Sequence, residues 1–209
     1  KHKYKLTEIG SYIEQCDERN SDDKYGVDFL RGVTNSGEFD KSKANTEGLK
    51  FTNYKVVKKG HFAYNPSRIN IGSIALHNNE LCIISPMYIV FRLNEKAKGV
   101  IIEEFMNLWF KRSEFQRSTL FYATGSVRDT FSFAEMKRVG IPIPPIEEQQ
   151  AIVSIYKCVA ECNRIAEEAD LPVHRASHGH SRTLRVHGSA LRRGPARPVL
   201  RVPYARADE

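Results

Sequence analysis

One stretch late in the sequence divides the chain into two parts: Gly140-Ile141-Pro142-Ile143-Pro144-Pro145-Ile146-Glu147-Glu148-Gln149-Gln150. Each proline fixes φ, removes a backbone N–H and biases the residue before it away from helix, so this part of the chain must be extended. The two glutamates that follow stand in the first turn of a new element, where they favour the positive end of a helix dipole. We therefore expect an extended segment over 140–145 and a helix that begins at Ile146.

The helix carries one narrow row of apolar and small residues. Their spacing of 3, 4, 3, 4 and 3 is typical of a coiled-coil seam. We therefore predict a helix over 146–170 that needs a partner helix, although packing of the seam on its own domain remains an alternative. The seam, which we predict to be a subunit interface, comprises Ile152, Ile155, Val159, Cys162, Ala166 and Ala169.

The sequence before this junction reads as a mixture of strands and helices. Short apolar runs between turn-forming residues predict strands of a mainly antiparallel sheet. Apolar residues at helical spacing predict flanking helices over 100–112 and 114–122, and Thr7 is expected to cap one short early helix. The expected fold class is therefore α+β, followed by the coiled-coil-type helix. The predicted strands are Asp28–Val33, His61–Tyr64, Ile71–Leu76, Leu81–Ile84 and Met87–Leu93.

The length and composition fit one substantial domain with a short accessory segment. The chain has 209 residues, of which 41% are hydrophobic and 27% charged, as in a soluble globular protein. No apolar run is long enough to span a bilayer and no signal-peptide pattern follows Lys1, so we expect a cytoplasmic protein. The four irregularly spaced cysteines read as reduced thiols rather than as a disulfide framework.

The composition changes abruptly after Asp170. Residues 1–170 carry 24 basic and 23 acidic residues, whereas residues 171–209 carry eight arginines against two acids and contain no Lys, Ile, Asn or Phe. We interpret 171–209 as a disordered tail, frameshifted or otherwise not native to the domain, and exclude it from the fold. A basic arm that binds nucleic acid and a histidine metal site are the functional alternatives for this tail.

A binding signal lies between Glu47 and Glu80. These two acids enclose 32 residues that contain no acid, and basic, aromatic and amide side chains alternate there. Lys and Arg neutralise phosphates, while Arg fits guanine and Asn fits adenine at the base edges of the major groove. A solvated basic strand face is the structural alternative. The candidate DNA-binding residues of this stretch are Lys55, Lys58, Lys59, Tyr64, Asn65, Arg68 and Asn70.

A second basic cluster surrounds the single acid Glu114 and flanks the loop 124–128. It adds the candidate DNA-binding residues Lys111, Arg112, Arg117, Ser126 and Arg128. If the chain reads DNA, then Lys58, Arg68 and Arg128 should share one concave face as wide as a duplex. No phosphate loop, zinc helix or nucleophile elbow is present, and Tyr64-Asn65-Pro66-Ser67 lacks the second proline and the aromatic residue of an amino-methyltransferase motif. We therefore expect no catalytic residues, no metal and no cofactor.

Several motifs, in this order, resemble the DNA-specificity subunits of type I restriction-modification systems. The junction 140–153 looks like the boundary between a target recognition domain and its long helix in that family. Upstream features agree over about residues 4–169: Tyr64-Asn65-Pro66-Ser67-Arg68-Ile69-Asn70-Ile71-Gly72-Ser73, Ile84-Ser85-Pro86-Met87-Tyr88-Ile89-Val90-Phe91, and Gly125-Ser126-Val127-Arg128 before Phe133–Val139.

The resemblance implies a non-catalytic subunit that reads one half of a bipartite site in double-stranded DNA. It would dock methyltransferase subunits and, through them, restriction subunits, with no membrane partner. Residues 4–145 would be the recognition domain and 146–170 the docking helix. Family members typically carry two such halves, so a homodimer is one way for this single half to work. The alternative is a docking module that tethers an enzyme subunit through the helix without reading DNA.

Overall fold

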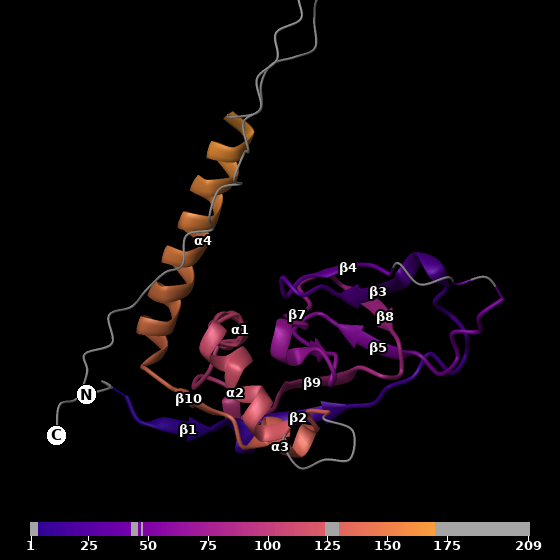
Figure 1. Ribbon diagram of the computed structural model, residues 1–209, viewed down its shortest axis with the longest axis horizontal. Coiled ribbons are helices and arrows are strands. Elements are labelled where there is room, and N and C mark those ends of the chain that lie inside the picture. The colour runs from indigo at the N-terminus through magenta and orange to yellow at the C-terminus, as the bar shows by residue number, and fades with distance from the viewer. Residues whose placement is uncertain (1–3, 43–45, 47, 124–129, 170–209) are drawn as a thin grey trace, which may run out of the picture.

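The computed structural model describes residues 4–42, 46, 48–123 and 130–169 (Figure 1). The predictions for the tail 171–209 and for the side chains of Ser126 and Arg128 lie outside the described residues. Of Ala169 only the backbone is described.

Two four-stranded sheets form the centre of the body. One has the strand order β2-β9-β6-β7 and is antiparallel throughout. The other has the order β4-β3-β8-β5, in which only β3 and β8 pair in parallel. The strands are β2 (Ile13–Cys16), β3 (Leu30–Val33), β4 (Phe39–Lys41), β5 (Lys55–Lys58), β6 (Phe62–Tyr64), β7 (Ile74–Leu76), β8 (Leu81–Ile84) and β9 (Ile89–Leu93).

Alternating side chains join the two sheets and the helices into layers. In β6, Phe62 and Tyr64 face the helices, whereas Ala63 faces the second sheet. Small and β-branched side chains fill the space between the sheets, which lets the two backbones approach closely. That inner layer consists of Val33, Val57, Ala63, Ala75, Cys82, Ile84 and Val90.

Three helices cover the outer face of the first sheet. They are α1 (Glu103–Phe110), α2 (Ser113–Ala123) and α3 (Phe133–Lys137). Phe110 of α1 meets the stacked rings of Phe62 and Phe91, whose centroids lie 4.9 Å apart. Burial of these large aromatic side chains makes this the principal core of the body.

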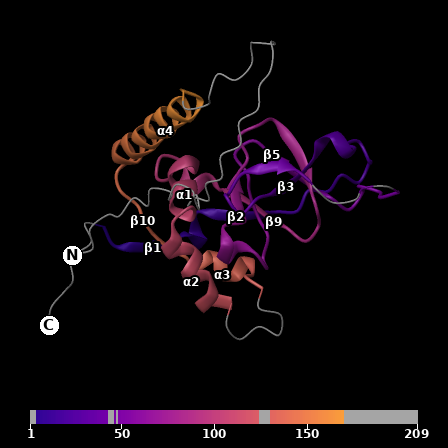
Figure 2. The ribbon, with the colours of Figure 1, turned by 45° about the horizontal axis from the view of Figure 1, so that its top comes forward.

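The junction stretch takes the form that its prolines predict. Gly140–Pro142 is strand β10, which pairs antiparallel with β1 (Leu6–Glu8), and α4 follows over Ile146–Ala169. The first turns of α4 lie against α1, and the rest of the helix projects away from the body (Figures 1 and 2).

The α+β class and the mainly antiparallel sheet are confirmed, but one predicted element is wrong. Leu6–Glu8 is a strand, and only a single 3-10 turn, Ile9–Ser11, follows it without any side-chain cap from Thr7. Pairing with β10 takes the backbone groups that a helix would have used. The sequence patterns did not predict β2, β4, β5 or the short helix α3, which begins with a capping box between Ser132 and Glu135.

Candidate nucleic-acid interface

The β6–β7 hairpin determines where the predicted DNA-binding side chains lie. Phe62 pairs with Leu76 at one end of the hairpin and Tyr64 with Ile74 at the other. Lys58 and Lys59 precede the first end, whereas Arg68 belongs to the loop beyond the second. Lys58 and Arg68 therefore lie beyond opposite ends of the hairpin, and since Arg128 lies outside the described residues, the shared concave face stays a prediction.

Three of the predicted contact residues are buried, and we withdraw them as candidates. The side chain of Lys55 is 7% exposed and its Nζ lies 3.0 Å from Asp17 Oδ1. Tyr64 is fully buried in the helix-side core, where burial raises the pKa of its hydroxyl. Asn65 is also buried, and its Oδ1 accepts a hydrogen bond from the Ser67 backbone N–H at 3.0 Å. These side chains shape the fold instead of facing a partner.

The hairpin loop is a rigid turn centred on the 3-10 turn η3 (Ile69–Ile71). The carbonyl of Arg68 accepts hydrogen bonds from the backbone N–H groups of Ile71 and Ser73, at 3.2 and 3.1 Å. Gly72 has φ +98°, and a Cβ there would lie 2.3 Å from the carbonyl oxygen of Asn35. Only glycine fits this position, so the turn is held tightly against the β3–β4 hairpin.

Arg68 and Asn70 project from this turn. Arg68 is exposed and Asn70 half-buried, and neither side chain makes a hydrogen bond or ion pair with the part of the chain that the structure describes. Most other candidate cations are already paired. Within the part of the chain that the structure describes, the cations paired with carboxylates are Arg19, Lys55, Lys58, Arg92, Lys111, Arg112, Arg117, Lys157 and Arg164.

The second predicted cluster lies beside this turn. Helix α2 packs against η3, and the Phe131 backbone N–H donates to the Pro66 carbonyl at 3.0 Å. The segments on either side of 124–129 are therefore adjacent to the Asn65–Asn70 turn. The fold brings together the two regions that the sequence singled out separately.

The cations of this second cluster have partners within the chain. Lys111 pairs with Glu38, and the Arg112 guanidinium lies 4.2 Å from the centre of the Trp109 ring. Arg112 and Arg117 also lie 3.5 and 3.9 Å from carboxylate oxygens of Glu114. These positive charges are partly offset before any ligand binds.

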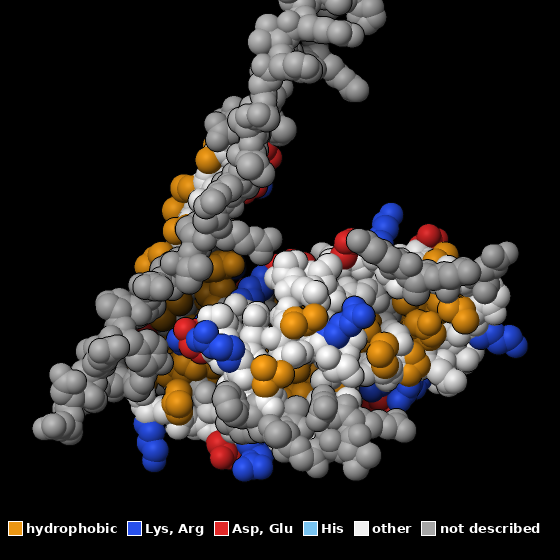
Figure 3. Space-filling model, in the orientation of Figure 1, with side chains coloured by type: hydrophobic (Ala, Val, Ile, Leu, Met, Phe, Trp, Pro, Cys, Tyr) orange, Lys and Arg blue, Asp and Glu red, His pale blue; other side chains and the backbone are white. Residues whose placement is uncertain are grey.

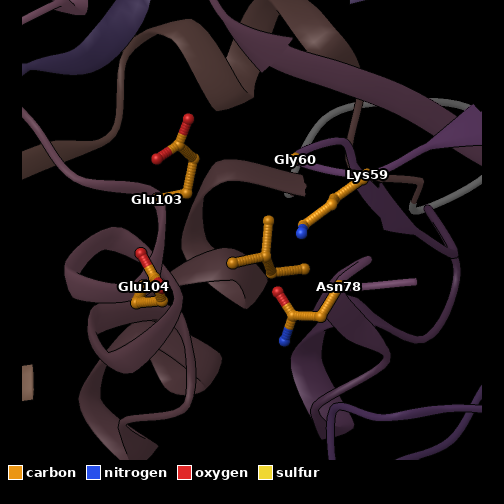
Figure 4. A pocket seen from close by; sticks show the side chains of 6 residues that line it. Lys59, Gly60, Asn78, Glu103 and Glu104 are labelled. Carbon is orange, nitrogen blue, oxygen red and sulfur yellow. The ribbon is translucent and has the colours of Figure 1, made fainter. Parts of the chain in front are cut away.

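The end of the hairpin near Lys58 and Lys59 is less suited to bind phosphate. Lys58 Nζ lies 2.6 Å from Glu18 Oε2. Lys59 lines a hollow of about 250 Å³ together with Asn78, and Glu103 and Glu104 stand across it (Figure 4). The two carboxylates make this hollow electrostatically mixed.

Helix α4 presents the predicted seam to solvent. Ile152, Ile155 and Val159 are 43%, 65% and 44% exposed, and Cys162 and Ala166 are exposed as well. Apolar side chains line the edge of α4 that faces away from the body (Figure 3). The alternative that the seam packs on its own domain therefore does not hold for the described residues. Tyr156 and Ile165, which the heptad count missed, are also exposed and widen this apolar face.

One anchoring residue was not singled out from the sequence. Gln149 is fully buried; its Oε1 accepts from the Ile102 backbone N–H at 3.0 Å. Its Nε2 donates to the carbonyls of Val100 and Pro144 at 2.7 and 2.8 Å. Its only sequence signal was its place in the Glu-Gln run after the prolines.

The described residues contain neither a metal-binding cluster nor a membrane-spanning helix. No three His, Cys, Asp or Glu side chains there are grouped to hold a metal ion. No helix of that part is long and apolar enough to cross a membrane.

An α+β body with a rigid exposed turn, followed by a projecting helix with an apolar face, is the architecture that these observations define. Residues 2–170 match the family model described as the type I restriction modification DNA specificity domain, so the chain belongs to this family. The matched range ends where the composition changes. No curated protein sequence matches the chain.

Two solved structures have a similar fold. The HsdS subunit from Thermoanaerobacter tengcongensis aligns with a TM-score of 0.56 at 18% identity, over 80% of this chain and 45% of that one. A chain in a structure of the type I R-M system, solved to explain its complex assembly and conformational transition, gives 0.51 at 15% identity, over 81% and 42%. This chain therefore spans less than half the length of either relative.

Proposed function

We propose that the chain is a non-catalytic specificity subunit that reads one half of a bipartite DNA target. In this proposal residues 4–145 are the recognition domain and 146–170 the docking helix. The helix binds methyltransferase subunits, which in turn carry the restriction subunits. Catalysis belongs to those partners.

The observation that carries the proposal is the pair Arg68 and Asn70, whose side chains make no hydrogen bond or ion pair with the described residues and whose backbone belongs to a hydrogen-bonded turn. Arginine pairs bidentately with guanine and asparagine with adenine in the major groove. The hydrogen-bonded turn already fixes the backbone that carries them, so binding needs to order only the two side chains. Since neither is used inside the described part of the chain, both are available for base edges.

Phosphate contacts come, in this proposal, from the start of α2 beside the turn. Lys111, Arg112 and Arg117 exchange their carboxylate partners for phosphate oxygens when the protein lies on a duplex. Such contacts position a protein on DNA without specifying sequence. Lys58 and Lys59 contribute less, because carboxylates stand near both.

The exposed apolar face of α4 supports the docking half of the proposal. A contiguous apolar face on a projecting helix is an unfavourable surface unless a partner covers it. A second copy of the chain packed antiparallel would also cover it and would place two recognition domains at opposite ends. That pair would read an inverted repeat with a fixed spacer.

Selection of bound sequences from a random pool of duplexes, with the full chain, tests DNA reading. Replacing Arg68 with Ala should relax preference at one base pair by about 10- to 100-fold, the effect of one bidentate contact. Arg92→Ala, at an exposed arginine on β9 that pairs with Glu14, is the control and should leave preference unchanged. Affinity should also fall steeply with salt, since each phosphate contact releases counterions.

If the chain is instead a docking module that does not read DNA, the selection experiment has a different outcome. In that case no sequence is enriched at any salt concentration, while binding of the methyltransferase subunits persists and depends on α4. Enrichment that is identical for the wild type and Arg68→Ala would keep DNA binding but refute base reading by Arg68.

A further inference from the structure

An exposed isoleucine stands beside the two free polar side chains of the hairpin turn. Ile71 is 48% exposed, whereas Ile69, two residues earlier in the same 3-10 turn, is 2% exposed and belongs to the core. Ile69 thus faces the core and holds the turn, whereas Ile71 faces solvent. An outward-facing branched side chain does not contribute to the core that anchors the turn.

The backbone fixes the position of Ile71 as tightly as that of its polar neighbours. Its N–H donates to the Arg68 carbonyl at 3.2 Å, and the next residue, Gly72, lies under the Asn35 carbonyl. Ser73 then donates its hydroxyl to the Val33 carbonyl at 3.0 Å. The chain on both sides of Ile71 is therefore pinned to the body, and its side chain is presented from a fixed base.

We propose that Ile71 contacts the C5 methyl group of a pyrimidine in the major groove, and so selects thymine at one position of the target. This inference rests on the proposed function, because it requires the turn to face DNA. Among the base edges of the major groove the thymine methyl is the only apolar group of unmodified DNA. The turn thus offers a cation, an amide and an apolar side chain. Arg68 and Asn70 would bind polar base edges, and Ile71 would contact a methyl group between or beside those edges.

Replacement of thymine by deoxyuridine removes that methyl and nothing else. In the sequence recovered by selection, each thymine is replaced singly and the affinity of the full chain is measured. For the wild type, one position should lose about fourfold in affinity, which corresponds to about 0.8 kcal/mol for one buried methyl group. The other positions should change little.

Three variants assign that loss to the side chain. With Ile71→Ala the deoxyuridine penalty at that position should disappear, and with Ile71→Val, which keeps the β-branch and loses only the Cδ1 methyl, most of it should remain. Met87→Ala is the matched control, since Met87 is 58% exposed but lies outside the turn, and it should keep the full penalty. Thermal unfolding of each variant verifies that the body is intact.

The outcomes separate the two proposals. If no sequence is selected, the proposed function fails and the inference fails with it. If a sequence is selected but contains no sensitive thymine, or if the penalty persists in Ile71→Ala, only the role of Ile71 is refuted.

A second experiment distinguishes the two bases that can carry a C5 methyl group, thymine and 5-methylcytosine. 5-Methylcytosine carries the C5 methyl on a different base, so each cytosine of the recovered site is replaced by 5-methylcytosine in turn. Selection of thymine predicts no gain in affinity at any cytosine. A gain of about fourfold at one cytosine, lost in Ile71→Ala, together with no sensitive thymine, would mean that a modified base is read instead and would overturn the assignment to thymine.

Discussion

The two ends of α4 differ in a way that inverts the usual rule for helices. In the first two turns a polar side chain, Gln149, is fully buried and Val153 is 8% exposed. Over residues 154–168 every residue is exposed, although the row contains Ile155 and Val159. The attached end is held largely by hydrogen bonds and the projecting end presents the apolar surface. This difference indicates that the first turns fix α4 to the body, whereas its hydrophobic residues further along stay exposed.

Geometry explains how one helix serves both purposes. With 3.6 residues per turn, Ile155 falls on the side opposite Val153 and Lys157, whereas Ile152 stands three residues after Gln149 and lies beside the attached face. Contacts with the body therefore leave the apolar row exposed from Ile155 onward, and Ile152, at 43%, is less exposed than Ile155, at 65%.

The largest expected effect on stability comes from a substitution at the attached end of α4. Gln149→Ala removes the partners of three buried or partly buried backbone groups, the N–H of Ile102 and the carbonyls of Val100 and Pro144. An unsatisfied buried group costs about 1–3 kcal/mol, so the free energy of unfolding should fall by about 3 kcal/mol or more. Urea unfolding followed by tryptophan fluorescence measures this, because Trp109 lies in α1.

The neighbouring residue provides the control. Gln150 is exposed, so Gln150→Ala should change the free energy of unfolding by less than about 0.5 kcal/mol. Equal losses for the two variants would mean that the attached end depends on helix propensity rather than on the buried hydrogen bonds.

A second substitution tests the projecting end. Ile155→Asp places a charge in the middle of the apolar face and should abolish self-association, which we expect at micromolar concentration, and docking of methyltransferase subunits. Because Ile155 is 65% exposed, the unfolding midpoint should stay unchanged when it is measured well below micromolar concentration, where the wild type is also monomeric. Sedimentation of the wild type and the variant, with and without the partner subunits, measures both forms of association.

Ser154→Asp adds the same charge one residue away, off the apolar face, and is the matched control. It should associate like the wild type. If Ile155→Asp still binds the methyltransferase subunits, and if the wild type and Ile155→Asp are both monomers, then the apolar face has no role in assembly. The contrast between the two ends of α4 would then have no consequence for binding.

The contrast could be read from the sequence only in part. The prolines before Ile146 and the acidic first turn predicted both the extended segment and the start of α4, because these effects are local to the backbone. The spacing from Ile152 onward predicted an apolar row. What the spacing could not show is which side touches the body, since that depends on whether Gln149 meets free backbone groups 47 and 49 residues earlier in the chain.

The same reasoning explains the mixed result at the candidate interface. Composition identified the acid-free stretch, in which Arg68 is exposed and Asn70 is half-buried; that they contact DNA stays a prediction. Lys55 looked equivalent, but Asp17, which pairs with it, lies outside that stretch and reaches it only through the fold. Strands as short as β4 and β5 lack a clear pattern of their own. Thr7 resembled a helix cap because the residue with which it pairs, Ile141 of β10, is far away in the sequence and the local pattern does not reveal it.

A third prediction contrasts the body with α4 through pH. His61 and His77 are buried in the body, and burial lowers the pKa of each below 6.5, with a further lowering from Arg92 and Lys58 for His61 and from His61 and Arg31 for His77. Below about pH 6.5 the unfolded chain therefore binds protons that the folded body does not. Stability should be full above that pH and fall as the pH decreases.

Urea unfolding between pH 5 and 8 measures this dependence. His77→Gln should flatten the slope below pH 6.5, whatever it does to stability at pH 8. A slope unchanged in that variant would show that His77 is not one of the groups that titrate on unfolding.

The smallest effect lies at the border between the two ends of α4. Lys157 Nζ is 3.5 Å from Glu104 Oε1, and both side chains are largely exposed, at 65% and 41%. Exposed ion pairs contribute about 0–1 kcal/mol, because water and salt screen the charges and two long side chains lose freedom. Lys157→Met, which keeps most of the stem, should therefore lower the free energy of unfolding by at most about 0.5 kcal/mol at low salt and by nothing measurable at 1 M salt. If the loss instead approached that of Gln149→Ala and survived high salt, the attached end of α4 would extend a further turn than the buried residues indicate, and the hydrogen bonds of Gln149 would no longer suffice to explain how the helix is held.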